Sequence, residues 1–213
     1  MIKAIFFDFD GVLTTDKTGS LTTARYLSER TGIGFDRIHD AFKPFNTELI
    51  LGRISHEEMW SELCAKLNRE VEIDLLKRAF ESTPINDGML RLAARLKQGY
   101  SVGIITDNKK DRIDHLKVHC NLASLFDPIV VSAEVGSDKR TSGIFEIALN
   151  SLGLNPAQSI FIDNNRDNLI VADALGINTI YFDDQSNDIA GLIAMLKNKY
   201  RVSIFGDKFL SVP

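Results

Sequence analysis

Residues 3–13 read KAIFFDFDGVL. The apolar run from Lys3 to Phe7 is typical of a strand that is buried on both faces. Asp8 and Asp10 follow it and are two residues apart, so an extended chain directs both carboxylates to the same side. Gly11 then allows the backbone to turn away sharply. The stretch therefore predicts a buried strand that ends at a pair of carboxylates.

Further short apolar runs follow, and helical patterns lie between them. The five runs are Lys3–Phe7, Ser101–Thr106, Pro128–Ser132, Ser159–Ile162 and Asn178–Phe182. The helical patterns of this part are Asp87–Gln98, Arg112–His119, Ser142–Leu152, Asn165–Leu175 and Asn187–Lys199. Strands that alternate with helices predict an α/β fold with a doubly wound parallel sheet.

Residues 16–84 break this alternation, because they contain helical patterns and no strand-like run. The patterns cover Thr22–Thr31, Asp36–Ala41, His56–Asn68 and Asp74–Ser82. We therefore expect an all-helical module after the first strand, called the helical insert below. The predicted organisation is a core domain of residues 1–15 and 85–199, the helical insert of residues 16–84, and a C-terminal extension of residues 200–213 with strand-like composition and no assigned role.

Composition narrows the classes of partner. The net charge of −4 disfavours general binding to nucleic acids or anionic membranes. The chain has no apolar window of the ~20 residues that a membrane span requires. Its two cysteines are too few for a disulfide framework and favour a reducing compartment, so we expect a cytoplasmic protein. The sequence does not indicate the oligomeric state.

Acidic side chains follow two of the predicted strands. Asp8 and Asp10 follow the first, and Asp163 and Asp167 follow the fourth. In open parallel sheets, ligands bind at the carboxyl ends of the strands, so these side chains are expected near one another. Several carboxylates repel unless they share a proton or a cation, and Mg²⁺ prefers carboxylate and water ligands. The pattern therefore predicts a magnesium site.

Groups suited to phosphate follow the other two strand ends. The Thr106 hydroxyl and the amides of Asp107 and Asn108 can donate to phosphate oxygens, and Lys139 supplies an ammonium. Nucleophile, acid, metal ligands, oxygen donors and a cation are what phosphoryl transfer needs. Simpler interpretations stay open: Thr106 and Asp163 also suit helix caps, and Lys139 and Asp167 suit a solvated surface.

These groups together resemble the four signature motifs of the haloacid dehalogenase superfamily. Residues 6–13 resemble the first motif, Thr106 the second, Lys139 the third and residues 161–168 the fourth. The helical insert is similar to the C1-type cap of that superfamily. Residues 52–58 and the fourth motif look similar to sugar-phosphate phosphatases of the superfamily. Four motifs in order, each after a predicted strand, form a specific pattern.

The resemblance implies a phosphatase mechanism. Asp8 would form an aspartyl-phosphate, and Asp10 would act as acid and then as base. Mg²⁺ would be held by Asp8, Asp163 and the backbone carbonyl of Asp10, with Asp167 supporting its waters. The expected partner is a small phosphate ester, for example a sugar phosphate. The chain departs from the common pattern at three positions, where it has Asp107, Arg140 and Asn164.

Other functions stay open on the same fold. A phosphosugar mutase would also keep both aspartates, and a non-catalytic binding module could keep the fold without turnover. A dehalogenase fits less well, because Asp10 supplies the acid that a phosphate ester's leaving group needs and carbon–halogen displacement does not.

Overall fold

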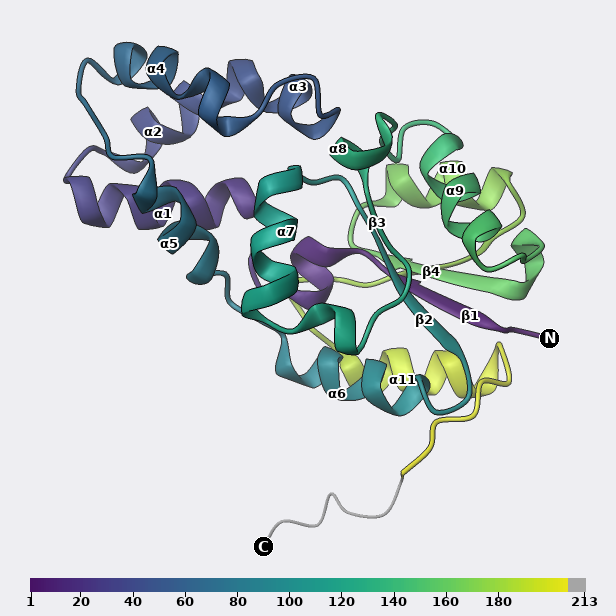
Figure 1. Ribbon diagram of the computed structural model, residues 1–213. Helices are drawn as coiled ribbons and strands as arrows, with labels where there is room; N and C mark the ends of the chain where they lie inside the picture. Colours follow the sequence, from purple (N-terminus) through teal and green to yellow (C-terminus); the bar gives the residue numbers. More distant parts are fainter. Residues whose placement is uncertain (207–213) are drawn as a thin grey trace, which may run out of the picture.

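Five parallel strands form one sheet in the computed structural model, which describes residues 1–206 (Figure 1). The strands are β1 (Ala4–Phe7), β2 (Ser101–Thr106), β3 (Ile129–Val131), β4 (Ser159–Asp163) and β5 (Asn178–Tyr181). Their order is β3-β2-β1-β4-β5, and Phe7 pairs with Ile104 on one side and with Ile162 on the other. The predicted parallel α/β fold is confirmed. Strands β2 and β3 are added on one side of β1, and β4 and β5 on the other. Open α/β sheets bind ligands at the point where the strand order changes side in this way.

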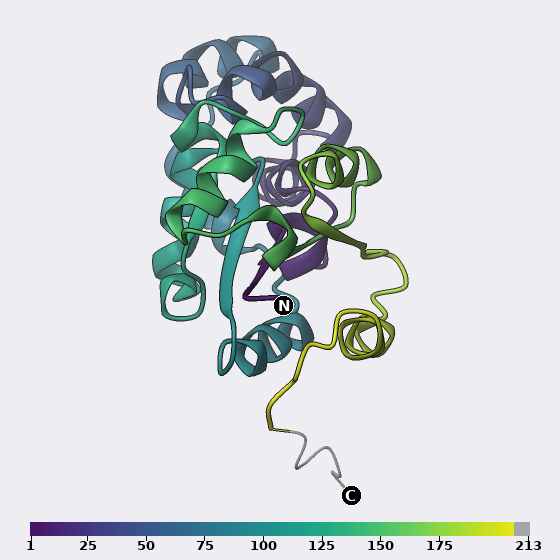
Figure 2. The same cartoon turned by 90° about the vertical axis from the view of Figure 1, so that its right-hand side faces the viewer.

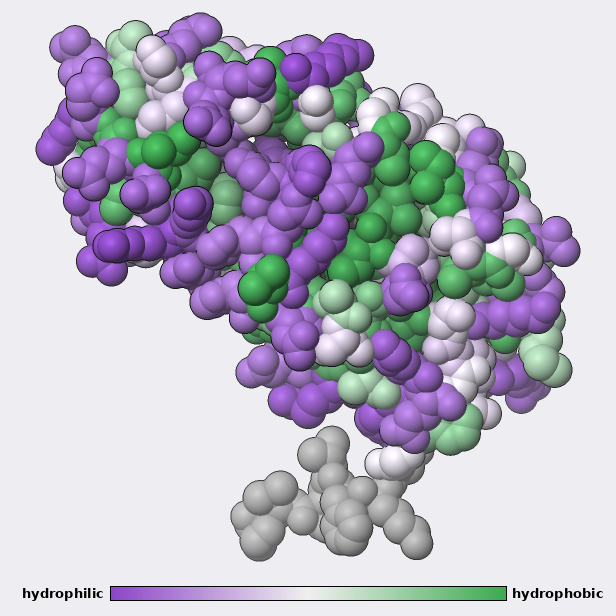
Figure 3. Space-filling model, in the orientation of Figure 1, coloured by the Kyte–Doolittle hydropathy of each residue, from purple (hydrophilic) through white to green (hydrophobic). Residues whose placement is uncertain are grey.

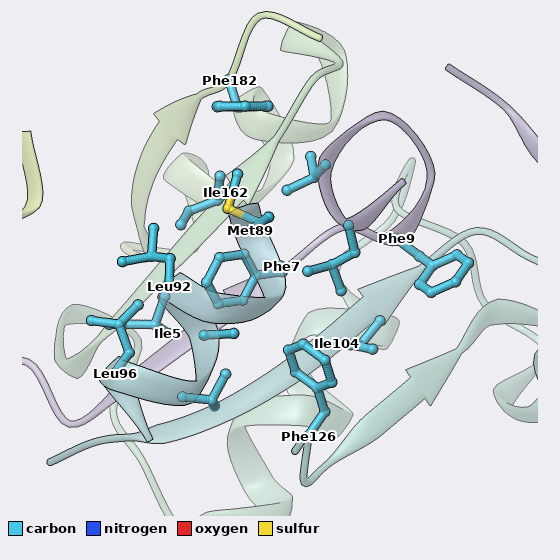
Figure 4. Close-up of a cluster of buried hydrophobic side chains, with 14 of the residues drawn as sticks. Ile5, Phe7, Phe9, Met89, Leu92, Leu96, Ile104, Phe126, Ile162 and Phe182 are labelled. Carbon is cyan, nitrogen blue, oxygen red and sulfur yellow. The ribbon is translucent and has the colours of Figure 1, made fainter. Parts of the chain in front are cut away.

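Helices cover both faces of the sheet, which explains why the central strands are rich in apolar residues. One face packs on α6 (Asp87–Leu96), α7 (Lys110–His119) and α11 (Ile189–Asn198), and the other packs on α9 (Gly143–Ser151) and α10 (Arg166–Ala174). Ile5 and Phe7 face the first group, and Phe6 faces the second. Figure 4 shows Phe7 and Phe126 within the first of these cores, with their ring centroids 6.2 Å apart.

The helical insert follows β1 and has an apolar core of its own. Its helices are α1 (Gly19–Thr31), α2 (Phe35–Phe42), α3 (Asn46–Ile50), α4 (His56–Leu67) and α5 (Asp74–Glu81). Phe45, Trp60 and Leu63 are buried among them. Figures 1 and 2 show these helices together at one end of the molecule, with α6 and α11 at the opposite end.

Element boundaries differ from the sequence-based ones where side chains end the regular pattern. The third strand is shorter than expected, because Ser132 begins the short helix α8 (Ser132–Val135). Helix α1 begins at Gly19 rather than Thr22, because the Thr18 side chain caps it by accepting from the Leu21 N–H. The short helix α3 was not predicted, and its five residues are too few to show a period.

The start of the C-terminal extension packs on the core. Val202 and Ile204 are buried in the cluster that holds α6 and α11, and residues 201–206 form no strand. Residues 207–213 of the predicted extension lie outside the described residues. Within residues 1–206, no helix has the length and apolar character needed to cross a membrane. Figure 3 shows mostly hydrophilic side chains over α4, α5 and α7, and a more hydrophobic area around β3.

Candidate active site

A cavity of about 590 Å³ lies between the strand ends and the helical insert. Its size suits a small molecule. The core contributes residues at or after the carboxyl ends of β1, β2, β3 and β4, among them Asp8, Thr106 and Lys139. The insert contributes residues of α1, α2 and α3, among them Ser20 and Phe42. Residues far apart in the sequence therefore meet around one space.

The loop after β1 positions the two aspartates. Asp8 caps the single helical turn Phe9–Leu13, and its Oδ1 accepts from the Phe9 N–H at 2.7 Å. Gly11 has a φ of 78°, and an added Cβ would lie 2.1 Å from the Asn164 side chain. A glycine is therefore required here both by the backbone conformation and by the close approach of Asn164.

The ammonium group of Lys139 forms ion pairs with two buried carboxylates. Lys139 Nζ lies 2.8 Å from Asp8 Oδ1 and 2.8 Å from Asp163 Oδ2, and all three side chains are almost fully buried. Burial raises the pKa of Asp8 to about 8; Lys139 lowers it and the nearby Asp163 raises it further. Burial lowers the pKa of Lys139, but Asp163 and Asp8 outweigh it and hold that pKa above its usual range. Asp8, Lys139 and Asp163 together therefore have a net charge of −1 when both carboxyls are ionised.

Asp163 is held rigidly at the end of β4. Its Oδ1 accepts from the Asn165 N–H at 2.6 Å, and its Oδ2 also accepts from Asn168 Nδ2 at 3.0 Å. Asp167 is exposed and is not among the cavity-lining residues, and its own N–H donates to Asn165 Oδ1. Its predicted support of the metal's waters stays a prediction.

The residues after β2 divide between the cavity and the protein interior. Thr106 lines the cavity, and its Oγ1 accepts from Asn108 Nδ2 at 3.3 Å, which leaves the hydroxyl hydrogen for a ligand. Asp107 also lines the cavity, and its Oδ1 accepts from the Lys139 N–H at 2.9 Å. The Asn108 side chain instead turns inward and donates to Asp10 Oδ2 at 2.9 Å.

Asp10 is paired with an arginine that sequence reasoning missed. Arg112 donates from Nη1 to Asp10 Oδ2 at 2.8 Å and from Nη2 to Asp10 Oδ1 at 2.9 Å. Only 2% of Arg112 is exposed. Burial would raise the pKa of Asp10, but the Arg112 guanidinium outweighs it and holds that pKa below its usual range. Asp10 is therefore an ionised carboxylate in this arrangement.

Arg112 also contacts both ends of the helical insert. Its Nη2 donates to Thr83 Oγ1 at 3.3 Å, and its guanidinium lies so close to Gly19 that an added Cβ would be 2.2 Å away. Arg112 lies four residues after Asn108, which precedes α7, and its Nη1 also donates to Asn108 Oδ1 at 3.0 Å. That spacing was the available sequence signal. Asn168 was likewise missed, five residues after the carboxylate that it contacts.

The donor set fits a hard divalent cation. Asp8 and Asp163 are buried carboxylates that share a single ammonium. The second oxygen of Asp8 accepts no hydrogen bond from the described residues, and Asp8 lines the cavity. Oxygen ligands with excess negative charge are what Mg²⁺ prefers. Asp10, which Arg112 already neutralises, does not add to that excess through its side chain.

Comparisons with known proteins agree with the motif pattern. The model of the haloacid dehalogenase-like hydrolase family matches residues 5–190. Bifunctional epoxide hydrolase 2 of Rattus norvegicus is 26% identical, in an alignment that covers 90% of this chain and 38% of the rat protein. The chain therefore spans little more than a third of the length of that relative. Glyceraldehyde 3-phosphate phosphatase of Methanothermobacter thermautotrophicus is 26% identical, with 84% and 85% of the two chains covered.

A solved structure shares the fold. It is a HAD family enzyme of Bacteroides thetaiotaomicron in complex with magnesium and inorganic phosphate, with a TM-score of 0.74, 21% identity, and coverage of 91% of this chain and 99% of the other. The family model matches most of the chain, from the strand that carries Asp8 to beyond β5. The protein belongs to the haloacid dehalogenase-like hydrolase family.

Proposed function

We propose that the protein is a Mg²⁺-dependent phosphatase that hydrolyses a small phosphate monoester through an aspartyl-phosphate on Asp8. The observation that carries the proposal is the arrangement around Lys139. Asp8 lies at the cavity with one carboxylate oxygen engaged and the other available, beside a second carboxylate and an ammonium. Such a site offers a nucleophile together with the charges that a phosphoryl group requires.

In the first step, an oxygen of Asp8 forms a bond to phosphorus as the bond from phosphorus to the ester oxygen breaks. The ester oxygen takes the electron pair and receives a proton from Asp10. Lys139 and the Thr106 hydroxyl donate to the phosphoryl oxygens. In the second step, Asp10 takes a proton from water as the water oxygen bonds to phosphorus. The bond from phosphorus to the Asp8 oxygen breaks, its electron pair returns to the Asp8 carboxylate, and inorganic phosphate is released.

The proposed metal ligands are the carboxylates of Asp8 and Asp163 and the backbone carbonyl of Asp10, with Asp167 near the metal's waters. The bound ion would neutralise charge between Asp8 and the incoming phosphate. Asp8 and Asp163 suit this task because they share only one ammonium. In this function Asn168 and the Asn165 N–H keep Asp163 oriented.

Asp10 must change partner during the reaction. In the structure it is ionised and held by Arg112, so it is ready to act as a base and not as an acid. To protonate a leaving group it must leave Arg112 and take up a proton. Because Arg112 also contacts Thr83 and lies against Gly19, a movement of the helical insert would alter this ion pair. We propose that the insert serves as a cap over the cavity.

The relatives support a phosphatase. The archaeal relative acts on glyceraldehyde 3-phosphate by its name, and the Bacteroides neighbour was solved with magnesium and inorganic phosphate. A small phosphorylated metabolite such as a sugar phosphate fits the cavity volume. The net charge of −4 and the two free cysteines suit a cytoplasmic enzyme that does not act on nucleic acids.

A panel of phosphate monoesters, assayed with Mg²⁺ and with EDTA, tests the proposal. We expect inorganic phosphate to be released from at least one ester, and EDTA to stop the release. Isomerised sugar phosphate in place of inorganic phosphate would identify a mutase instead. An absence of turnover across the whole panel with Mg²⁺ would contradict an enzymatic function and support a binding module.

A further inference from the structure

The cavity is lined by cationic side chains that its proposed chemistry does not use. Its acidic side chains are all engaged: Asp8 with Lys139, Asp10 with Arg112, and Asp107 with the Lys139 N–H. Lys17, Lys109 and Arg166 also line the cavity, and none has an ion-pair partner among residues 1–206. Lys43, by contrast, is paired with Asp40. Lys17 and Arg166 are exposed to water, whereas Lys109 is partly buried.

Lys109 is the most constrained of the three. It follows Asn108 and directs its Nζ at the helical insert, where it donates to Ser20 Oγ at 3.2 Å. The residue is partly buried, so its ammonium has little water to solvate it. Burial first, and then the neighbouring Arg112, lower the pKa of Lys109 to about 8. The carboxylates of Asp10, Asp111 and Asp107 raise the pKa in part, but none of them forms an ion pair with Lys109 among the described residues, so an anionic ligand would stabilise the ammonium.

The first turn of α1 adds donors beside Lys109. Gly19 and Ser20 line the cavity, and their N–H groups donate to no group of the described residues. Helix α1 has 13 residues, so its N-terminus has a substantial positive partial charge. Arg166 lies on the other side, after β4, with its guanidinium 3.8 Å from the centre of the Tyr181 ring. Lys109 and the first turn of α1 therefore lie together, and Lys17, two residues before Gly19, lines the same cavity.

We propose that Lys109, together with Lys17 and the first turn of α1, binds a second anionic group on the leaving-group side of the substrate. The substrate is then a phosphate monoester that also bears a carboxylate or a second phosphate. This inference rests on the proposed function, in which Asp8, Thr106 and Lys139 hold the transferred phosphoryl group. A hydroxyl in place of the second anion would leave the ammonium of Lys109 without a charge partner.

Three esters with the same two-carbon skeleton test this: 2-phosphoglycolate, ethane-1,2-diol bisphosphate and 2-hydroxyethyl phosphate. They carry a carboxylate, a second phosphate and a neutral hydroxyl, so the two anionic esters also distinguish the two sources of charge. We measure kcat/KM for each with the wild type, Lys109→Met and Lys110→Met. Lys110 is the matched control, because it is adjacent, exposed, paired with Asp114 and outside the cavity.

We expect the wild type to prefer at least one anionic ester to 2-hydroxyethyl phosphate. Lys109→Met should reduce that preference by about 10- to 100-fold, the usual effect of a lost charge-assisted hydrogen bond, mainly through KM. Lys110→Met should leave it unchanged. Equal losses on all three esters would place Lys109 at the transferred phosphoryl group and overturn the inference, as would a wild type with no preference.

A binding measurement distinguishes failure of the anion site from failure of the proposed phosphatase function. Binding of 2-phosphoglycolate and 2-hydroxyethyl phosphate to Asp8→Asn is measured by calorimetry with Mg²⁺, where no turnover is needed. The anion site is supported if Asp8→Asn binds 2-phosphoglycolate more tightly than 2-hydroxyethyl phosphate and the additional change Lys109→Met removes this difference. If the wild type at the same time hydrolyses none of the esters, the phosphatase is rejected and the anion site is retained. Hydrolysis of p-nitrophenyl phosphate and 2-hydroxyethyl phosphate, with equal binding of the two esters, would retain the phosphatase and reject the anion site.

Discussion

Two carboxylates two residues apart lie in opposite electrostatic environments. In the Asp8 pocket, which consists of Asp8, Lys139 and Asp163, one ammonium faces two carboxylates. In the Asp10 pocket, which consists of Asp10, Arg112 and Asn108, one carboxylate accepts three side-chain hydrogen bonds, two of them from a guanidinium. The pKa of Asp8 is accordingly raised and that of Asp10 lowered.

The difference assigns different tasks to the two groups. Asp8 has excess negative charge beside it and one available oxygen, so its pocket can accept a cation and a phosphoryl group. Asp10 is neutralised by its partner and is kept ionised, which suits proton transfer after release from Arg112. Environments that separate the pKa values of two neighbouring carboxyls are a common sign of separate acid–base and nucleophilic roles.

The largest effect is expected from Asp8→Asn. An amide cannot form the aspartyl-phosphate, so turnover should fall by roughly 10⁴-fold or more while the fold is retained. Steady-state phosphate release and circular dichroism measure the two properties. Asp173→Asn, a change at an exposed aspartate of α10, is the control and should keep full activity. A folded Asp8→Asn protein with near-normal turnover would reject Asp8 as the nucleophile.

Asp10→Asn should affect substrates unequally. A sugar phosphate has a poor alkoxide leaving group that needs an acid, whereas p-nitrophenolate leaves without one. Loss of general acid catalysis typically costs ~10²–10⁴-fold, so the sugar phosphate should suffer by about that factor more than p-nitrophenyl phosphate. Initial rates on both esters, with rapid mixing to detect a burst of p-nitrophenol, measure this. Equal losses without a burst would make Asp10 a structural residue.

Magnesium affinity should depend on pH through the Asp8 pocket. Burial raises the pKa of Asp8 to about 8 in the metal-free protein, so protons compete with the cation below that pH. The apparent Kd for Mg²⁺ should therefore weaken up to about tenfold for each pH unit between about pH 8 and pH 6, with release of about one proton. Calorimetry in buffers of different ionisation enthalpy measures both. An affinity that is constant over this range would contradict the raised pKa.

The smallest effect is expected in the Asp10 pocket. Arg112→Lys keeps the charge and loses the bidentate geometry, so the pKa of Asp10 should rise. Because Asp10 must be ionised to act as a base, the acidic limb of the pH profile of kcat should move upward, by about one unit or less. Arg91→Lys, at an exposed arginine of α6, should not move it. An unmoved limb in Arg112→Lys would mean that Arg112 does not control the ionisation of Asp10.

The fold was predictable because the central strands β1 and β4 are buried on both faces and β2 almost entirely so. Short apolar runs therefore marked all five strands, and the residues at or just after their carboxyl ends include Asp8, Thr106 and Asp163. The proximity of Asp8 and Asp163 followed from the parallel arrangement of β1 and β4. Their assigned roles stay predictions until turnover is measured.

Other parts of the site depend on contacts that sequence patterns do not record. Arg112 is a mid-chain cation in a helical pattern, and only the packing of α7 against the loop after β1 brings it to Asp10. Asn108 was expected to offer its amide to phosphate, but its backbone N–H donates to Ser132 Oγ at 2.9 Å and its side chain donates to Asp10. Lys109 became notable only because Ser20, 89 residues earlier, lies opposite it.

The central claim is that Asp8 carries the phosphoryl group. Asp10→Asn should slow hydrolysis of this intermediate, so the variant is mixed with Mg²⁺ and p-nitrophenyl phosphate, quenched in acid and digested. Mass spectrometry of the peptides then locates any added phosphoryl group. The account predicts a phosphoryl group on Asp8, formed in step with the burst of p-nitrophenol and absent from Asp8→Asn/Asp10→Asn. A burst with an unmodified Asp8, or a phosphoryl group on another residue, would contradict it.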